Sequence, residues 1–402
     1  MAYDLSSPEF LANPGPFLSR MRSEGALVRV KLPIIGQTWM TTSDAAARSL
    51  LKDPDRFARN PLAGTGKTLA QKYWYFPSFM KPLFQNMLGY DGAAHKRLRG
   101  LVDQAFNRTS IDDMRPRLAA LADDLLNAID TDQPTEIISQ YTRPLPLMAI
   151  CDLLGVPDAE RTKVAHWIAP LSGPTSAWGM LRGFPGLWRI MRYFRADFDR
   201  ARQHPRSGLI TDLVAAEDAG DRLTDDELLA MVVTLFIAGH ETTVHLITMG
   251  IYGLLIHPAA RAALRDHPDE LPLLVEEFMR FYSPVMMTKP HFVQQDTVFE
   301  GISLKKGEQV AALLIAANHD TARFDTPEEL IPNRRPNAHL GFGHGPHVCL
   351  GMQLARAEAQ VAIERLFIRF PDLALANPDA APEYTRRIGI HGLKRLNLRL
   401  AG

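Results

Sequence analysis

One cysteine near the C-terminal end of the chain stands in a setting that suits a reactive thiolate. Cys349 lies in the stretch FGHGPHVCLG, where two glycines and a proline before it indicate a tight loop. The residues that follow, MQLARAEAQVAIERLF, carry apolar side chains at helical spacing. A sulfur at a helix start faces backbone N–H groups, which lower a thiol's pKa and stabilise negative charge. Cys349 is therefore either a metal-binding thiolate or a small buried residue in a turn.

The wider pattern around this cysteine favours the first interpretation. The sequence Phe-Gly-x-Gly-x-x-x-Cys-x-Gly, followed directly by a helix, resembles the haem-binding loop of the cytochrome P450 family. The resemblance implies that Cys349 is the axial iron ligand of haem b (iron protoporphyrin IX), where its thiolate favours O–O cleavage. Phe342 would pack near the sulfur, and His347 would reach a haem propionate. Gly343 and Gly351 would let the backbone approach the sulfur.

A second segment, AGHETT at residues 238–243, resembles the oxygen-activating part of the family's distal helix. By this resemblance, Ala238 and Gly239 would leave space over the haem for dioxygen. Thr242 would hold the bound oxygen and an ordered water, while Glu241 relays protons from solvent. The alternative is structural: Thr242 bonds to a backbone carbonyl one turn earlier, and Glu241 pairs with a cation.

The same segment begins like the zinc-protease motif HExxH. In HETTVH, however, His245 follows His240 by five residues instead of four. At roughly 100° per residue, His245 is turned roughly 140° from His240 around the helix axis, so both rings cannot face one metal. The spacing therefore argues against a zinc protease.

Partners for the haem propionates are expected in three places. The segment DGAAHKRLRGLVDQAF resembles the family's helix beside the haem, with His95 and Arg99 one turn apart on one face. His347 is the second candidate. In the strand after SPVMMTKP, relatives often have arginine, whereas this chain has His291, which can lose its charge near neutral pH. Without the resemblance, His95 and His291 would read as surface residues.

A further pair of charged residues is expected to support the fold. In EEFMRFYSP, Glu277 and Arg280 are three residues apart and share one helical face. In the family a Glu-x-x-Arg pairs with an arginine before the haem loop, and Arg334 in PNRRPNAHLGFG suits that role. We assign these three residues to the integrity of the fold and haem pocket, outside the chemistry.

These motifs need a mainly helical scaffold to hold them. The longest predicted helix begins at Thr224, where TDDE offers a capping box with Glu227, and Pro258 ends it. Its apolar residues could span a membrane, but the polar cluster at 240–243 favours a buried core helix. Strand-like segments occur near 26–42, 291–314 and 385–400. We predict a mainly α fold with a smaller β subdomain, which resembles the cytochrome P450 fold. By this resemblance the haem would lie between the distal helix and the cysteine-loop helix. The whole chain, 1–402, is expected to form one domain.

Composition agrees with a soluble enzyme, and the family resemblance implies a bacterial one, because eukaryotic members usually carry a membrane anchor. The 402 residues are 46% hydrophobic and 22% charged, and the formal net charge is zero, so no bulk attraction to nucleic acid or anionic membrane is expected. The two cysteines suit a reducing cytoplasm, and Cys151 lies in an apolar run typical of a core. The N-terminal residues lack the pattern of a signal peptide or membrane anchor. We therefore expect a cytoplasmic protein.

The substrate pocket is expected to be apolar. Segments 72–88 and 166–194 are rich in aromatic residues, Met and Leu, at positions where family members form the pocket roof and lid, although such stripes are also typical of plain core packing. Offsets from the motifs give the pocket residues Thr234, Ile237, Ala238, Val285, Met287 and Ile388. A terpenoid, fatty acid, steroid, aromatic or macrolide-like molecule would suit such a wall.

The implied reaction is that of a haem-thiolate monooxygenase, which uses dioxygen and external electrons to hydroxylate or epoxidise a small hydrophobic substrate. The electrons would come from a separate ferredoxin, or a flavodoxin, and its reductase, since two cysteines cannot also hold an iron–sulfur cluster. A local basic patch for this partner would use Lys96, Arg97, Arg108 and Arg356. Two alternatives stay open: a peroxide-driven haem-thiolate peroxygenase, and a non-catalytic haem-binding sensor or carrier.

Overall fold

The computed structural model describes residues 3–33, 35–68, 71, 77–84, 86–108, 111–168, 177–218 and 223–400. The α-helices are α1 (Pro8–Ala12), α2 (Gly15–Glu24), α3 (Asp44–Leu51), α4 (Leu62–Thr65), α6 (Gly92–Arg108), α7 (Ile111–Asn127), α8 (Pro144–Leu154), α9 (Asp158–Ile168), α10 (Ala177–Gln203), α11 (Leu209–Asp218), α12 (Asp225–Ile256), α13 (Pro258–Asp266), α14 (Leu271–Tyr282), α15 (Leu314–Asn318) and α16 (Met352–Arg369). The shorter helices are η1 (Ser78–Phe84), η2 (Met87–Gly89), η3 (Ile138–Thr142), η5 (Pro268–Glu270) and η6 (Gly345–His347). The strands are β1 (Leu27–Leu32), β2 (Gly36–Thr41), β3 (Phe57–Ala58), β4 (Thr135–Glu136), β5 (His291–Val293), β6 (Thr297–Phe299), β7 (Ile302–Leu304), β8 (Gln309–Ala311), β9 (Ala374–Leu375) and β10 (Asn397–Arg399).

The strands join segments that are far apart in the sequence. The largest sheet has the order β1-β2-β8-β5-β3, in which β2 and β8 are parallel and the other neighbours antiparallel. A second sheet has the order β4-β10-β9, and β6 pairs with β7. The predicted segments 26–42 and 291–314 therefore supply most strands. Segment 385–400 contains only the short β10 and isolated bridges such as Val285 with Ile390, since the chain turns at Gly389 with a positive φ of 76°.

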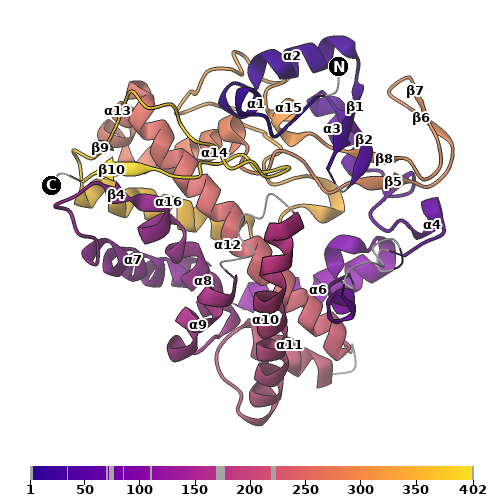
Figure 1. Ribbon diagram of the computed structural model, residues 1–402, viewed down its shortest axis with the longest axis horizontal. Helices are drawn as coiled ribbons and strands as arrows, with labels where there is room; N and C mark the ends of the chain where they lie inside the picture. Colours follow the sequence, from indigo (N-terminus) through magenta and orange to yellow (C-terminus); the bar gives the residue numbers. More distant parts are fainter. Residues whose placement is uncertain are drawn as a thin grey trace.

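Helix α12 passes through the middle of the molecule and organises the site (Figure 1). It begins with the predicted capping box, in which Thr224 Oγ1 accepts from the Glu227 N–H and the Glu227 carboxylate accepts from the Thr224 N–H. It contacts α8, α10, α14 and α16 along its length. Among the described helices only α12 is long and apolar enough to cross a membrane, and 67% of its most apolar window is buried inside the protein.

Two glycines on α12 let α14 approach closely. A Cβ at Gly253 would lie 2.7 Å from Tyr282 Oη, and one at Gly250 would lie 2.9 Å from the Phe278 ring. Both distances are too short for ordinary contact, so larger residues there would push the helices apart. This close packing fixes α14 against the centre of the molecule.

Candidate active site

The loop before α16 has the tight backbone that the sequence predicts. Gly343 and Gly345 have left-handed φ values of 74° and 70°. A Cβ at Gly345 would collide with the backbone of Leu51. The Cys349 N–H donates to Phe342 O at 2.9 Å, which closes the loop. The glycines therefore set the position of the sulfur.

Charges and burial act on the Cys349 thiol in opposite directions. Burial raises its pKa above the ordinary value, and the Gly351 N–H together with Arg99 and Arg356 only partly offsets this effect. The expectation that N–H groups would lower the pKa is therefore wrong for the net shift, because the loss of hydration outweighs the helix start. A thiolate at this position needs a further positive charge, such as a metal ion.

One cavity joins the cysteine loop to the distal helix. Its lining residues come from η2, α6, α8, α12 and the segment 347–355, and among them are Leu88, His95, Arg99, Thr234, Ala238, Gly239, Thr242, His347, Cys349 and Gly351. Cys349 lines it from the loop before α16, and the small residues Ala238 and Gly239 line it from α12. At Gly239 a Cβ would come within 3.1 Å of Ile150 on α8, so only a small residue fits there.

Glu241 and Thr242 have partners within the protein. Thr242 Oγ1 donates to Ala238 O at 2.8 Å, one turn earlier on α12. The Glu241 carboxylate forms an ion pair with Arg387 from the loop before β10. These are the contacts of the structural alternative, and a proton relay would require both side chains to leave them. Sequence reasoning missed Arg387, for which only its place next to Ile388 was a signal.

The predicted propionate partners on α6 and the cysteine loop lie side by side. The ring centroids of His95 and His347 are 4.2 Å apart. Burial and the nearby cations lower the pKa of His95 to about 4. Arg99 Nη1 donates to Val348 O at 2.7 Å, and its Nε lies 3.2 Å from Asp103, so this guanidinium is already engaged.

His291 occupies a different position from these residues. Its ring is buried, and burial followed by the charges of Arg59 and His347 lowers its pKa well below the ordinary value. It is not among the residues that line the cavity. Its Nδ1 is buried without a hydrogen-bond partner, as is Nδ1 of His347.

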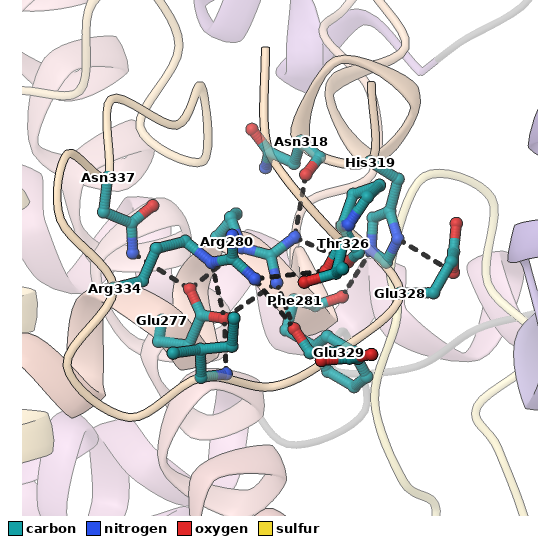
Figure 2. Close-up of polar contacts among 12 residues, drawn as sticks. Glu277, Arg280, Phe281, Asn318, His319, Thr326, Glu328, Glu329, Arg334 and Asn337 are labelled. Atoms are coloured by element: carbon teal, nitrogen blue, oxygen red, sulfur yellow. Dashed lines mark hydrogen bonds and ion pairs between the residues drawn. The ribbon is translucent and has the colours of Figure 1, made fainter. Parts of the chain in front are cut away.

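The contacts predicted among Glu277, Arg280 and Arg334 are present (Figure 2). Arg280 binds both carboxylate oxygens of the fully buried Glu277, at 2.8 and 2.9 Å, and Arg334 Nε donates to Oε1 at 3.1 Å. The remaining N–H groups of the two guanidinium ions reach backbone carbonyls, among them those of Asn318, Pro327, Asp325, Thr326 and Glu329. Asn337 also donates to Glu277, a contact that the sequence did not predict.

The predicted substrate residues separate into two groups. Thr234 and Ala238 line the cavity beside Cys349. Four others, Ile237, Val285, Met287 and Ile388, are not among its lining residues; Met287 pairs with Leu313 and is buried. Part of the predicted roof and lid, residues 72–76, 85 and 169–176, lies outside the described residues.

The predicted basic patch is largely neutralised by ion pairs. Arg97 pairs with Glu227, and Arg356 pairs with Glu276 at 2.7 Å while its guanidinium lies over the Phe342 ring. Lys96 is exposed on α6. The side chain of Arg108 lies outside the described residues.

Cys151 is fully buried on α8, as expected for a core residue, and burial raises its pKa to about 12.

Glu358 is a buried acid that the sequence reasoning missed. It lies on α16, is fully buried, and neither carboxylate oxygen has a well-formed hydrogen bond, although the Thr243 hydroxyl of α12 faces it. Burial raises its pKa well above the ordinary value. The position of Glu358 in the helical pattern did not indicate burial, because charged residues on an amphipathic helix are usually exposed.

His240 and His245 make separate contacts. His240 Nδ1 lies 3.1 Å from Phe236 O, and the buried His245 ring packs against Gly392. In the described part of the chain, no three His, Cys, Asp or Glu side chains gather closely enough to hold a metal ion.

A family model and similar relatives all point to the same protein family. The cytochrome P450 family model matches residues 187–382. The vitamin D(3) 25-hydroxylase of Pseudonocardia autotrophica is 36% identical over 98% of this chain and 95% of its own length. The biotin biosynthesis cytochrome P450 of Bacillus subtilis is 34% identical over 98% of each chain.

Solved structures agree. The Bacillus subtilis bacillaene polyketide synthase cytochrome P450 PksS is 30% identical and superposes with a TM-score of 0.90 over the whole of both chains. A myxobacterial cytochrome P450 in complex with myristic acid is 34% identical, with a TM-score of 0.89 over 99% of each chain. The predicted fold is therefore confirmed, and the chain belongs to the cytochrome P450 family of haem monooxygenases.

Proposed function

We propose that Cys349 is the thiolate ligand of haem b in a monooxygenase that hydroxylates or epoxidises a small hydrophobic substrate. The observation that carries the proposal is the cavity that Cys349 lines together with Ala238, Gly239 and Thr242 of the distal helix. The residues fit a haem in two further respects: desolvation of the Cys349 thiol outweighs the charges of Arg99 and Arg356, so a thiolate there needs a further positive charge, and His347 Nδ1 lacks a partner. When bound, the haem iron supplies the binding and reduction of dioxygen.

The residues around the cavity would hold the haem at its edges. Phe342, Gly343 and Gly351 shape the loop around the sulfur. We assign the propionates to His95, Arg99, His291 and His347. Arg99 would give up its bond to Val348 O for this purpose, because a guanidinium binds a carboxylate more strongly than it binds a neutral carbonyl.

Proton delivery is assigned to Glu241 and Thr242. Thr242 lines the cavity, and rotation away from Ala238 O would turn its hydroxyl toward the cavity interior. Glu241 lies next to it and pairs with Arg387, so it would alternate between this cation and the cavity side of α12. The pair would thus move protons from the solvent-facing loop to the buried face of the helix.

The substrate would occupy the apolar side of the cavity, against Thr234 and Ala238, and only a substrate that extends beyond the cavity would reach the other expected wall residues, Ile237, Val285, Met287 and Ile388. A relative named for vitamin D(3) hydroxylation and a structure bound to myristic acid support a lipid-like molecule.

We further propose that the protein is cytoplasmic and receives electrons from a separate ferredoxin or flavodoxin. Lys96, which is exposed on α6, would be one cation available to such a partner. Glu277, Arg280 and Arg334 would hold the single domain together around the haem.

The axial ligand is tested by the reduced carbon monoxide spectrum of three proteins. The parent chain and Cys151→Ala are expected to show the absorption band typical of thiolate ligation, because Cys151 lies in the core of α8. Cys349→Ala is expected to lose the band. A histidine-type spectrum in the parent, or an unchanged band in Cys349→Ala, would refute the assignment.

A further inference from the structure

A second cavity adjoins the one beside Cys349, and the charged residues that line it are all cations. Its volume is about 340 Å³, and Leu88 lines both cavities. Apolar side chains form much of its wall, namely Ile35, Leu83, Phe84, Leu88, Pro290 and Phe292. The charged residues of its lining are Arg59 and Lys289, and no carboxylate of the described chain lines it.

Arg59 is buried, yet its guanidinium has no acidic partner among the described residues. Only 9% of the residue is exposed. Its Nη1 donates to Lys289 O, and its Nε has no partner. The acid whose charge acts on it, Asp91, accepts instead from the backbone N–H groups of Arg59 and Asn60, at 3.0 and 2.8 Å. A buried cation left in this state is costly and calls for an anion.

Other groups without partners surround the same point. The charge of Arg59 acts on the His291 ring, whose Nδ1 has no partner, and the charge of His347 acts there too. Nδ1 of His347 is likewise without a partner, while its Nε2 lies 3.7 Å from Asp91. Positive charge and unpartnered polar atoms therefore converge where the two cavities meet.

We propose that Arg59 and Lys289 form a carboxylate-binding site at this boundary. The site supplies the fixed positive charge that His291 cannot supply at neutral pH. A guanidinium presents parallel N–H groups that match the two oxygens of a carboxylate. Two carboxylates can reach this point: a haem propionate, or the acid end of an amphipathic substrate whose apolar part fills the second cavity. The inference rests on the proposed haem site.

The electrostatics of the two cations agree with this site. Burial lowers the pKa of Arg59 to about 10, although the charge of Asp91 opposes the shift. Lys289 is exposed to the pocket, but protein atoms crowd its ammonium group, and this crowding together with the charge of Arg59 lowers its pKa to about 8. A bound carboxylate would relieve both groups.

The test uses the holoenzymes of Arg59→Leu, Arg59→Lys and Lys289→Met, with Lys306→Met as the matched control on an exposed turn. The first measurement is the rate of haem transfer to excess apomyoglobin. The second is the affinity for dodecanoic acid and for dodecanol, read from the shift of the haem spectrum. Only variants that keep the thiolate band of the carbon monoxide complex are compared, so a failure of the haem assignment is seen separately.

If the site holds a propionate, Arg59→Leu and Lys289→Met should lose haem at least about tenfold faster than the control. Arg59→Lys, which keeps the charge, should lose haem at a rate between that of Arg59→Leu and that of the control. If it holds a substrate, both should bind dodecanoic acid at least about tenfold more weakly and dodecanol unchanged. Unchanged haem transfer and unchanged dodecanoic acid affinity would overturn the proposal. Should Arg59→Leu fail to fold, Lys289→Met and Arg59→Lys decide, because Lys289 is exposed.

Discussion

Arg387 forms an ion pair with Glu241, and this contact links the loop before β10 to the distal helix. Thr242, the next residue on α12, is bound at the same time to Ala238 O. The acid and the hydroxyl that the resemblance assigns to proton delivery are therefore both held by the protein. Their release, and not only their presence, should limit proton transfer.

Replacement of Glu241 by Gln should slow product formation. The amide cannot deliver a proton, and loss of a positioned acid typically costs about 10²-fold in rate or more. Arg387→Gln should leave the rate unchanged or higher, because it frees the carboxylate. The measurement is product formed under saturating reductant and dioxygen, with the exposed Glu364→Gln as the control. Equal rates for Glu241→Gln and the control would assign Glu241 to the structural pair alone.

Thr242→Ala should leave the fold intact and change the fate of the electrons. The substitution removes one bond within α12, while alanine is a better helix former than threonine. Without the hydroxyl, we expect several-fold less product per electron consumed and a matching rise in hydrogen peroxide. Thr242→Ser, which keeps the hydroxyl, should behave like the parent. Unchanged coupling in the alanine variant would refute the relay.

The parts of the site that the sequence predicted are those defined by short local patterns. Cys349 and its glycines depend on backbone geometry within one loop, and the Thr224 capping box depends on four adjacent residues. Local rules describe such features well, because their partners are neighbours in the chain. The pairing of Glu277 with Arg280 belongs to the same group.

The features that were missed depend on contacts between distant segments. Arg387 reaches Glu241 across 146 residues of chain, a separation given by their numbers. Asp91 binds the backbone beside Arg59, and Glu358 faces Thr243 on another helix. Whether such a charged residue is exposed or buried follows from the packing of helices, which periodicity on one helix does not reveal. The same reason explains why His291 does not line the cavity.

Loss of the buried carboxylate at Glu277 should destabilise the protein strongly. Glu277→Gln leaves two buried guanidinium ions without their anion, and breaking a buried pair typically costs about 3–5 kcal/mol. The free energy of unfolding can be measured by urea titration followed by circular dichroism. Glu383→Gln, which breaks the exposed pair with Lys394, serves as the control and should have little effect. A Glu277→Gln protein as stable as this control would show that the network is dispensable.

Acid should destabilise the fold through buried histidines such as His245. Burial lowers its pKa to about 3, whereas an unfolded histidine has a pKa of about 6.5. Between these values the unfolded chain binds the proton and the folded chain does not, so stability is lost as the pH falls below about 6.5. His245→Gln should reduce the slope of unfolding free energy against pH by up to about 1.4 kcal/mol per pH unit. The exposed His166→Gln should keep the parent slope, and equal slopes in both variants would contradict the assignment.

Glu358 should have the opposite effect, on the alkaline side. Its folded pKa is raised well above the ordinary value by burial, so the folded chain keeps a proton that the unfolded chain releases. The contribution to stability is full below the unfolded pKa of about 4.3 and is lost as the pH rises toward the folded pKa. Glu358→Gln mimics the protonated form and should remove this loss, up to about 1.4 kcal/mol per pH unit as the pH rises above the unfolded pKa. Urea titrations at several pH values test this, with the exposed Glu364→Gln on the same helix as the control. If Glu358→Gln and the control lose stability equally with rising pH, then Glu358 is ionised in the folded protein and must have an additional cationic partner.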